Sequence, residues 1–264
     1  MIKQSIFQVD AFTSTLYTGN PAAVCPLEYW LDEAVMQLIA RENNLSETAF
    51  IVPDGKDYQI RWFTPNTEVD LCGHATLASA FVLFELLNHQ EQEIFFKSKS
   101  GVLTVKKEGS LLKMDFPGLP FTRIEPNSEL IKAIGIVPDE VYQSKFDMLC
   151  IFNDAMLIKQ AKPDLNVLAK MSCRGIILSA PGTETDVYSR CFYPGCDVPE
   201  DPVTGSAHCV IAPYWCDRLN KKKIHACQGG NRQGELWCEI NQDRVILSGY
   251  SQLYLQGEIW VPSI

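Results

Sequence analysis

The chain has 264 residues, a formal net charge of −9 and a hydrophobic content of 46%. This is enough for one large domain, or for two domains of about 130 residues, with well-filled cores. The one basic cluster, residues 221–223, makes nucleic acid a poor partner. The richest apolar run, residues 75–87, is shorter than the roughly 20 residues of a membrane span. These features predict a protein with neither a membrane nor a nucleic-acid partner.

The ten cysteines raise the question of disulfides or a metal site. The first ten residues lack the apolar core of a signal peptide, and a chain of this length needs no covalent staples. The chain has only four histidines and no CxxC or HExxH motif, so the usual zinc spacings are missing. We therefore expect a cytoplasmic protein with reduced thiols and no metal.

Alternating apolar and polar residues predict strands over much of the chain. In chain order, the predicted strands cover residues 5–12, 58–63, 93–98, 101–107, 111–116, 155–159, 175–179, 187–192, 223–228, 235–240 and 244–248. The predicted helices cover residues 31–43, 75–87, 127–134, 164–171 and 207–219. This mixture indicates an α+β fold in which strands predominate.

Two of the predicted helices, residues 75–87 and 207–219, are unusual because their sequences are apolar around nearly the whole circumference. Such a helix must be enclosed by protein, and a curled sheet is the natural enclosure in a strand-rich chain. Pro213 is expected to kink or shorten the second helix, because proline removes an internal hydrogen bond.

The two apolar helices also mark an internal repeat. The first copy reads Phe63-Thr-Pro65 and then Gly73-His74-Ala75; the second reads Phe192-Tyr-Pro194 and then Gly205-Ser206-Ala207. Each copy follows a predicted strand and leads into a buried helix. Two such copies predict two similar lobes.

Each copy places a glycine, Gly73 or Gly205, at the start of a buried helix. Unpaired backbone N–H groups there carry positive potential, so two facing helix starts would bind a substrate carboxylate. Alternatively, both glycines simply fill tight turns, and the residues alone leave the two readings open.

Polar residues gather at these helix starts and after the helix at 31–43. Each has a structural alternative: Glu47 as a surface residue in a turn, Asp201 as a turn residue before proline, and His74 as a ring bonded to a carbonyl. No single residue decides the matter. The polar candidates near the two helix starts are Asp70, Cys72, His74, Glu200, Asp201, Thr204, Ser206 and His208.

Taken together, the motifs are specific, and the chain resembles the phenazine-biosynthesis F-like isomerase family over essentially its full length. The matching stretches, in order, are Gln8-Val-Asp-Ala-Phe12, Gly19-Asn-Pro-Ala-Ala-Val24, Asn44-Leu-Ser-Glu-Thr-Ala-Phe50, Ile60-Arg-Trp-Phe-Thr-Pro65, Glu68-Val-Asp-Leu-Cys-Gly-His-Ala-Thr76, Glu200-Asp-Pro-Val-Thr-Gly-Ser-Ala-His208 and Ala212-Pro-Tyr-Trp215.

The resemblance implies a fold like that of diaminopimelate epimerase, with two lobes, each a curled and mainly antiparallel sheet around a central helix, and a site between the lobes. We expect an N-terminal lobe of residues 1–116 plus about 250–264, containing helix 75–87. Residues 117–249 would form a C-terminal lobe around helix 207–219. The resemblance also implies a homodimer that needs no cofactor.

The resemblance assigns proton transfer to Glu47, with His74 and Asp201 as its catalytic partners. The residues it implies for substrate binding are Asn20, Gly73, Gly205, Ser206, Gly229 and Gly230. The implied reaction moves a proton on a small unsaturated or cyclic carboxylic acid. A carboxylate that takes a proton from one carbon and returns it to another performs such an isomerisation.

Two other functions stay open. Amino-acid racemases of this fold use two cysteines, and Cys72 fits the first position, but the repeat places Thr204 at the second. Because threonine is a poor proton acceptor at neutral pH, a two-thiol racemase is disfavoured. A non-catalytic protein that binds small acids is the other alternative.

Overall fold

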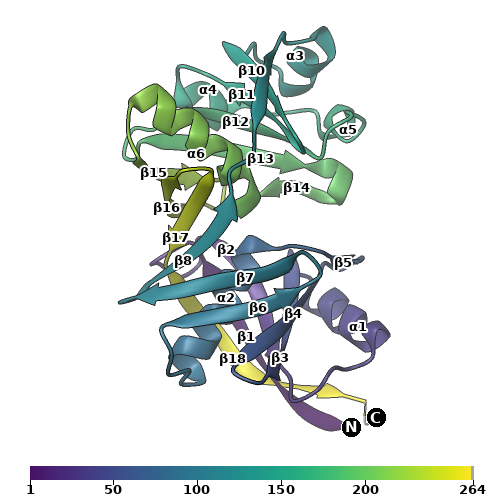
Figure 1. Cartoon of the computed structure of the whole chain (residues 1–264). Coiled ribbons are helices and arrows are strands. Elements are labelled where there is room, and N and C mark those ends of the chain that lie inside the picture. Colours follow the sequence, from purple (N-terminus) through teal and green to yellow (C-terminus); the bar gives the residue numbers. More distant parts are fainter. Residues whose placement is uncertain (263–264) are drawn as a thin grey trace. The chain divides into compact units, whose positions relative to one another are not determined.

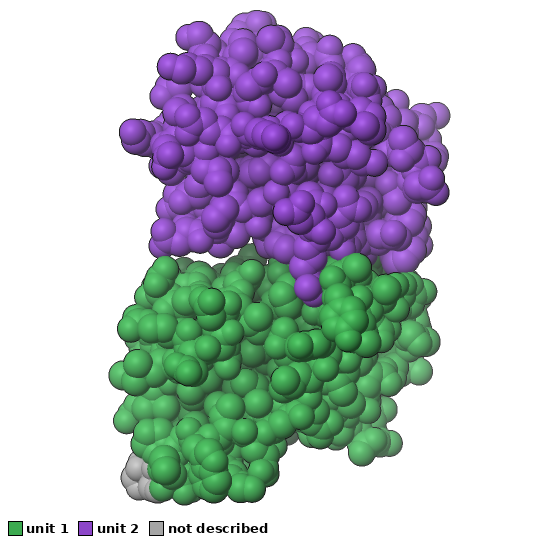
Figure 2. All heavy atoms as spheres, turned by 180° about the vertical axis from the view of Figure 1, so that it is seen from behind, with its two compact units in different colours: residues 1–115, 248–264 green, residues 116–247 purple. Residues whose placement is uncertain are grey.

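The computed structural model describes residues 1–262, which form two compact units. Of the described residues, unit 1 contains 1–115 and 248–262, and unit 2 contains 116–247 (Figure 2). The strands outnumber the helices in both units, so the predicted α+β class is confirmed. None of the described helices is long and apolar enough to span a membrane.

Unit 1 is a curled sheet around one central helix (Figure 1). Its strands are β1 (Ile2–Ala11), β2 (Asn20–Pro26), β3 (Glu47–Asp54), β4 (Asp57–Phe63), β5 (Glu68–Val69), β6 (Glu93–Ser98), β7 (Gly101–Glu108), most of β8 (Leu111–Pro117), and β18 (Ser251–Val261). Its helices are α1 (Glu33–Asn43), α2 (Gly73–Phe81) and the π-helical turn η1 (Val82–Leu86).

The order of strand pairing in unit 1 places α2 inside the sheet. β2 and β3 are parallel, β3 and β4 antiparallel, β4 and β6 parallel, and β6 and β7 antiparallel. Helix α1 makes the first parallel crossover, and α2 with η1 makes the second. Helix α2 packs on β1, β2, β3 and β18, and its residues from His74 to Ala80 are all buried.

Unit 2 is also a curled sheet with a central helix. Its strands are β9 (Phe121–Ile124), β10 (Glu140–Ser144), β11 (Asp147–Ile151), β12 (Gly175–Pro181), β13 (Val187–Tyr193), β14 (Val198–Asp201), β15 (Lys223–Gln228), β16 (Gly234–Asn241) and most of β17 (Arg244–Gly249). Its helices are α3 (Ser128–Ile134), α4 (Ala155–Gln160), α5 (Leu165–Leu168), the 3₁₀ turn η2 (Pro194–Cys196) and α6 (Gly205–Leu219).

The pairing in unit 2 repeats that of unit 1 step by step. β11 and β12 are parallel, β12 and β13 antiparallel, β13 and β15 parallel, and β15 and β16 antiparallel. Helix α6 occupies the crossover that α2 occupies in unit 1, and it packs on β11, β15 and β16. The repeat found in the sequence is therefore a repeat of the whole topology, and both apolar helices are buried as predicted.

The last strand that follows each copy of the repeat along the chain pairs in the unit of the other copy. β9 follows β8 along the chain but pairs with β10 inside unit 2. β18 follows β17 but pairs with β1 inside unit 1, from Ile2 opposite Val261 to Ala11 opposite Ser251. Unit 1 is therefore discontinuous in sequence.

Three of the local predictions need correction. Residues 155–159, predicted as a strand, belong to helix α4, because the Asp154 side chain accepts a hydrogen bond from the Met156 N–H and caps that helix. The helix predicted at 75–87 begins earlier, at Gly73, and changes to a π-helical turn at Val82. The helix predicted at 164–171 is the single turn Leu165–Leu168.

Pro213 does not shorten α6, which continues to Leu219. A proline leaves the carbonyl four residues before it without its helical partner, which here is the carbonyl of Cys209. The backbone N–H of Leu119 donates to that carbonyl at 2.9 Å. The missing bond is thus replaced from outside the helix, and the proline is tolerated in its interior.

Candidate active site

Glu47 is the first residue of β3, at the point where the chain enters the sheet after α1. Asn44 ends α1 in the left-handed conformation, and its N–H donates to the Ala40 carbonyl. Glu47 then lies opposite Ala22 of the parallel strand β2. Its side chain is only 15% exposed, so the surface-turn alternative does not hold.

His74 is the second residue of α2 and brings its ring against Glu47. The ring Nε2 lies 3.1 Å from Glu47 Oε2, and the His74 side chain is only 6% exposed. On the other side of the ring, Nδ1 lies 3.2 Å from the Asn20 amide nitrogen and 3.5 Å from Cys72 Sγ. The side-chain amide of Asn20 has both a donor and an acceptor. It can therefore donate to Nδ1 when this nitrogen carries no proton, or accept from Nδ1 when it does.

Electrostatics raise the pKa values of both His74 and Cys72. Burial lowers the pKa of His74, but the neighbouring Cys72 and Glu47 raise it more, and the net pKa lies well above the usual value. Burial, with a contribution from the Glu47 charge, raises the pKa of Cys72 to about 11. At neutral pH the thiol is therefore protonated and is a poor base.

Glu47, Cys72 and His74 also raise the question of a metal, since each offers one ligand atom and these atoms lie within 4.8 Å of one another. The His74 ring turns Nε2 towards Glu47 and Nδ1 towards Cys72. Zinc accepts these three residue types as ligands, so the absence of a metal stays a prediction.

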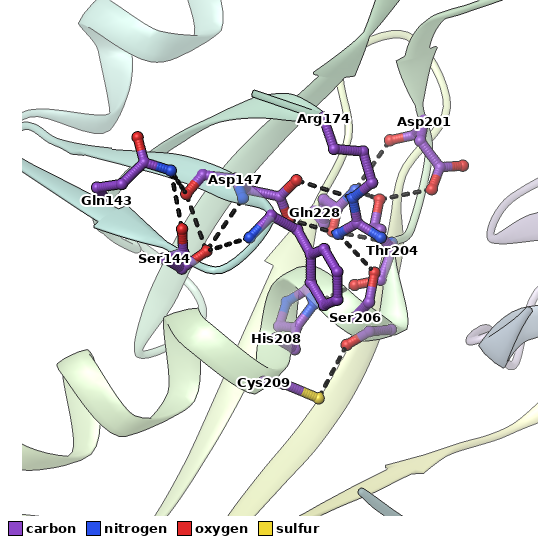
Figure 3. A network of polar contacts seen from close by, with 12 residues as sticks. Gln143, Ser144, Asp147, Arg174, Asp201, Thr204, Ser206, His208, Cys209 and Gln228 are labelled. Atoms are coloured by element: carbon purple, nitrogen blue, oxygen red, sulfur yellow. Dashed lines mark hydrogen bonds and ion pairs between the residues drawn. The ribbon is translucent and has the colours of Figure 1, made fainter. Parts of the chain in front are cut away.

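In unit 2, Ser206 is the second residue of α6, the same place that His74 has in α2. Its Oγ accepts a hydrogen bond of 3.0 Å from Arg174 Nη2. Arg174 precedes β12 and also pairs with Asp147, whose side chain is completely buried (Figure 3). Sequence reasoning missed Arg174 and Asp147, which no motif marks.

Asp201 ends β14 and is held by two side chains. Thr204 Oγ1 donates to Asp201 Oδ2, and Gln228 Nε2 donates to the Asp201 backbone carbonyl at 2.9 Å. Gln228 Oε1 in turn accepts the Thr204 N–H at 3.0 Å, which fixes the turn into α6 (Figure 3). Gln228 is fully buried and was also missed by sequence reasoning, although it directly precedes Gly229.

Packing alone accounts for Gly229 and Gly230. Gly229 has a φ of +117°, and a Cβ there would overlap the Arg232 carbonyl oxygen. A Cβ on Gly230 would lie 2.8 Å from a carboxylate oxygen of Glu200. A contact of either glycine with substrate stays a prediction.

His208, one of the polar candidates, is a buried residue in the first turns of α6. Its Nδ1 lies 2.9 Å from the Thr204 carbonyl and donates to it. Burial lowers the pKa of His208 to about 4, so the ring is neutral.

The structure brings the sequence candidates together in two groups, one in each unit. Unit 1 holds Asn20, Glu47, Cys72 and His74, and unit 2 holds Asp201, Thr204, Ser206 and His208.

Comparison with known proteins decides the family. The model of the family described as "phenazine biosynthesis-like protein" matches residues 9–257. The chain belongs to this family. It is 48% identical over 258 residues to an uncharacterized isomerase of Pseudomonas aeruginosa, covering 97% of this chain and 98% of that protein. Other curated relatives at 45% and 46% identity are also named isomerases, and the chain is an enzyme of that class.

Solved structures agree with the family and the fold. A protein of the same family from Enterococcus faecalis matches with a TM-score of 0.96 and 43% identity, covering 98% of this chain and all of that one. A probable proline racemase of Agrobacterium radiobacter matches with a TM-score of 0.64 at 8% identity, covering 98% of this chain and 93% of that one. The second likeness shows a shared fold only, and it agrees with the epimerase-like architecture predicted from the sequence.

Proposed function

We propose that this isomerase moves a proton on a small unsaturated or cyclic carboxylic acid, with Glu47 as the acid/base. The observation that carries the proposal is the largely buried Glu47 carboxylate, with His74 Nε2 3.1 Å from one of its oxygens. His74 orients that oxygen, which leaves the other oxygen for a substrate C–H group. A base held in this way is ready for proton abstraction.

The reaction needs no oxidant or reductant. Glu47 takes a proton from a carbon next to the unsaturated system, and the electron pair of the broken C–H bond moves into that system towards the carboxyl group. The protonated Glu47 then returns the proton to another carbon, where the electron pair forms the new C–H bond. We assign stabilisation of the developing negative charge to His74, whose raised pKa keeps it protonated.

We assign the other predicted residues to binding and to assisting the proton transfer. Ser206 and the backbone N–H groups around Gly205 and Gly73 are suited to a carboxylate, because the first N–H groups of a helix lack partners within it. Asp201, held in place by Thr204 and Gln228, is suited to assist Glu47 in the proton transfer. Asn20 supports the ring of His74.

Solvent exchange tests the proposal. A panel of small unsaturated and cyclic carboxylic acids is incubated with the enzyme in D₂O, and deuterium incorporation at carbon is followed by NMR. Glu47→Gln keeps the shape of the side chain but removes the base, so exchange should fall by about 10²–10⁴-fold. Glu235→Gln is the matched control, because Glu235 makes the exposed pair with His225 at 2.9 Å. Equal exchange in all three proteins would refute the role of Glu47.

Amino-acid racemisation is the second candidate, because Cys72 Sγ lies 3.5 Å from His74 Nδ1. The raised pKa of the buried thiol and the threonine at position 204 argue against it. Loss of optical activity in a single amino-acid enantiomer would identify this reaction, whereas the proposed isomerase leaves amino acids unchanged.

We also propose that the enzyme is a cytoplasmic homodimer. Strand β18 carries the exposed apolar side chains Tyr254, Leu255 and Trp260, which a second copy would cover. Light scattering coupled to size-exclusion chromatography should give twice the chain mass of 29.7 kDa.

A further inference from the structure

Three side chains of unit 2 form a continuous chain of polar contacts that ends at Ser206. Asp147, fully buried at the start of β11, accepts from Arg174 Nε at 2.9 Å and also pairs with Nη2. The same Nη2 donates to Ser206 Oγ at 3.0 Å (Figure 3). Asp147 begins β11 and Arg174 immediately precedes the adjacent parallel strand β12, so the strand pairing brings the two side chains together, and Arg174 alone contacts Ser206.

The direction of the hydrogen bonds fixes what Ser206 can do. A guanidinium has donors only, so Ser206 Oγ must accept the bond from Arg174. The hydroxyl proton of Ser206 is then free to donate to a different acceptor. A hydroxyl that accepts from a cation is also a stronger donor, because hydrogen bonds in a chain polarise one another.

Arg174 is held more firmly than an ordinary surface arginine. Its guanidinium contacts two aromatic rings, with Cζ 5.2 Å from the centre of the Phe146 ring and 5.3 Å from that of the Tyr193 ring. Its backbone N–H donates to the Phe146 carbonyl at 2.7 Å. With Asp147 completing the pair, the side chain has little freedom to leave Ser206.

We propose that Arg174 is a positioning residue, which makes Ser206 an oriented hydroxyl donor for a carboxylate group of the ligand. This inference rests on the proposed function and narrows the substrate class to acids whose carboxylate accepts from Ser206. Arg174 acts through Ser206 and does not itself touch the ligand. The energetic effects of changing Arg174 and Ser206 should therefore not add.

The test compares a carboxylate with its neutral amide. Benzoate and benzamide are titrated into the isotope-labelled protein, and the dissociation constants are taken from shifts of the Gly205 and Ser206 amide signals. Benzoate has no sp³ C–H group, so its binding does not depend on proton transfer. Wild type should prefer benzoate by at least about tenfold, the effect of a hydrogen bond to a charged group.

Ser206→Ala and Arg174→Gln should each reduce that preference by about tenfold, and the double variant should lose no more than either single one. Because Arg174→Gln leaves Asp147 buried without its partner, Asp147→Asn/Arg174→Gln is measured as well and should behave in the same way. Arg218→Gln is the control, since it breaks the pair with Glu140 at 2.7 Å and does not touch Ser206. Its preference should equal that of wild type.

Three results would overturn the inference: no preference in wild type, an unchanged preference in both Arg174 variants, or losses that multiply in the double variant. The last result would mean that Arg174 contacts the ligand directly. Failure of the proposed function looks different, because it would appear as unaltered solvent exchange in Glu47→Gln while the benzoate preference still follows Arg174.

Discussion

His74 and Ser206 occupy equivalent positions, each being the second residue of a buried helix that begins with glycine. In unit 1 the partner comes from the start of β3 and is the carboxylate of Glu47; in unit 2 it comes from just before β12 and is the guanidinium of Arg174. The same scaffold therefore presents opposite charges in its two copies. One copy carries the groups that we propose for proton transfer, and the other carries those that we propose for binding an anion.

Replacing His74 should change how stability depends on pH. Because the folded state raises the pKa of His74, its stabilising contribution is complete below the unfolded value of 6.5 and is lost as the pH rises through the folded value. The difference in free energy of unfolding between wild type and His74→Gln should therefore shrink above pH 6.5, by about 1.4 kcal/mol per unit of pKa rise. Urea unfolding from acidic to alkaline pH measures it; a constant difference would contradict the prediction.

Replacing His208 should have the opposite effect. The folded state lowers its pKa from 6.5 to about 4, so only the unfolded chain takes up the proton in this range, and stability falls as the pH drops through it. His208→Asn keeps a donor near the Thr204 carbonyl but does not titrate. Wild type should lose on the order of 3 kcal/mol relative to the variant across this window, as measured by urea unfolding.

Cys72→Ser separates the isomerase from a thiol-dependent racemase. Since burial keeps the thiol protonated, the serine variant should retain most of the solvent exchange of wild type. In the native protein the thiol should also react slowly with iodoacetamide. If Cys72→Ser abolished exchange while Glu47→Gln spared it, the acid/base assignment would have to move to the thiol.

Gly175→Ala tests how tightly the site in unit 2 is packed. A Cβ at this first residue of β12 would overlap the ring of Tyr193, which flanks Arg174. We expect a loss of about 1–3 kcal/mol in the free energy of unfolding, typical of overpacking. Gly195→Ala is the control, because its Cβ would meet nothing closer than 3.5 Å. Equal stabilities would show that the ring moves aside without cost.

Sequence patterns predict much of the fold because equivalent residues recur in the two copies of the repeat. Phe63 corresponds to Phe192, and Gly73 corresponds to Gly205. The role proposed for Glu47 is different, since its neighbours indicate an ordinary turn and only the family resemblance singles it out. The Glu47 side chain becomes buried only when α2 packs inside the sheet, and the sequence around Glu47 does not predict that contact. Arg174 and Asp147 are far apart in sequence and meet only because β11 and β12 run parallel.

The pairing of β18 with β1 affects the order in which the two units can fold during synthesis. As the ribosome extends the chain, β1 emerges long before β18, the strand that pairs along its whole length. Until then one edge of β1 has unpaired backbone groups, and such an edge invites association with other chains. Unit 2, which is continuous from Phe116 to Leu247, can finish folding first. Premature termination before β18 would therefore release chains with a completed second half and an aggregation-prone first half.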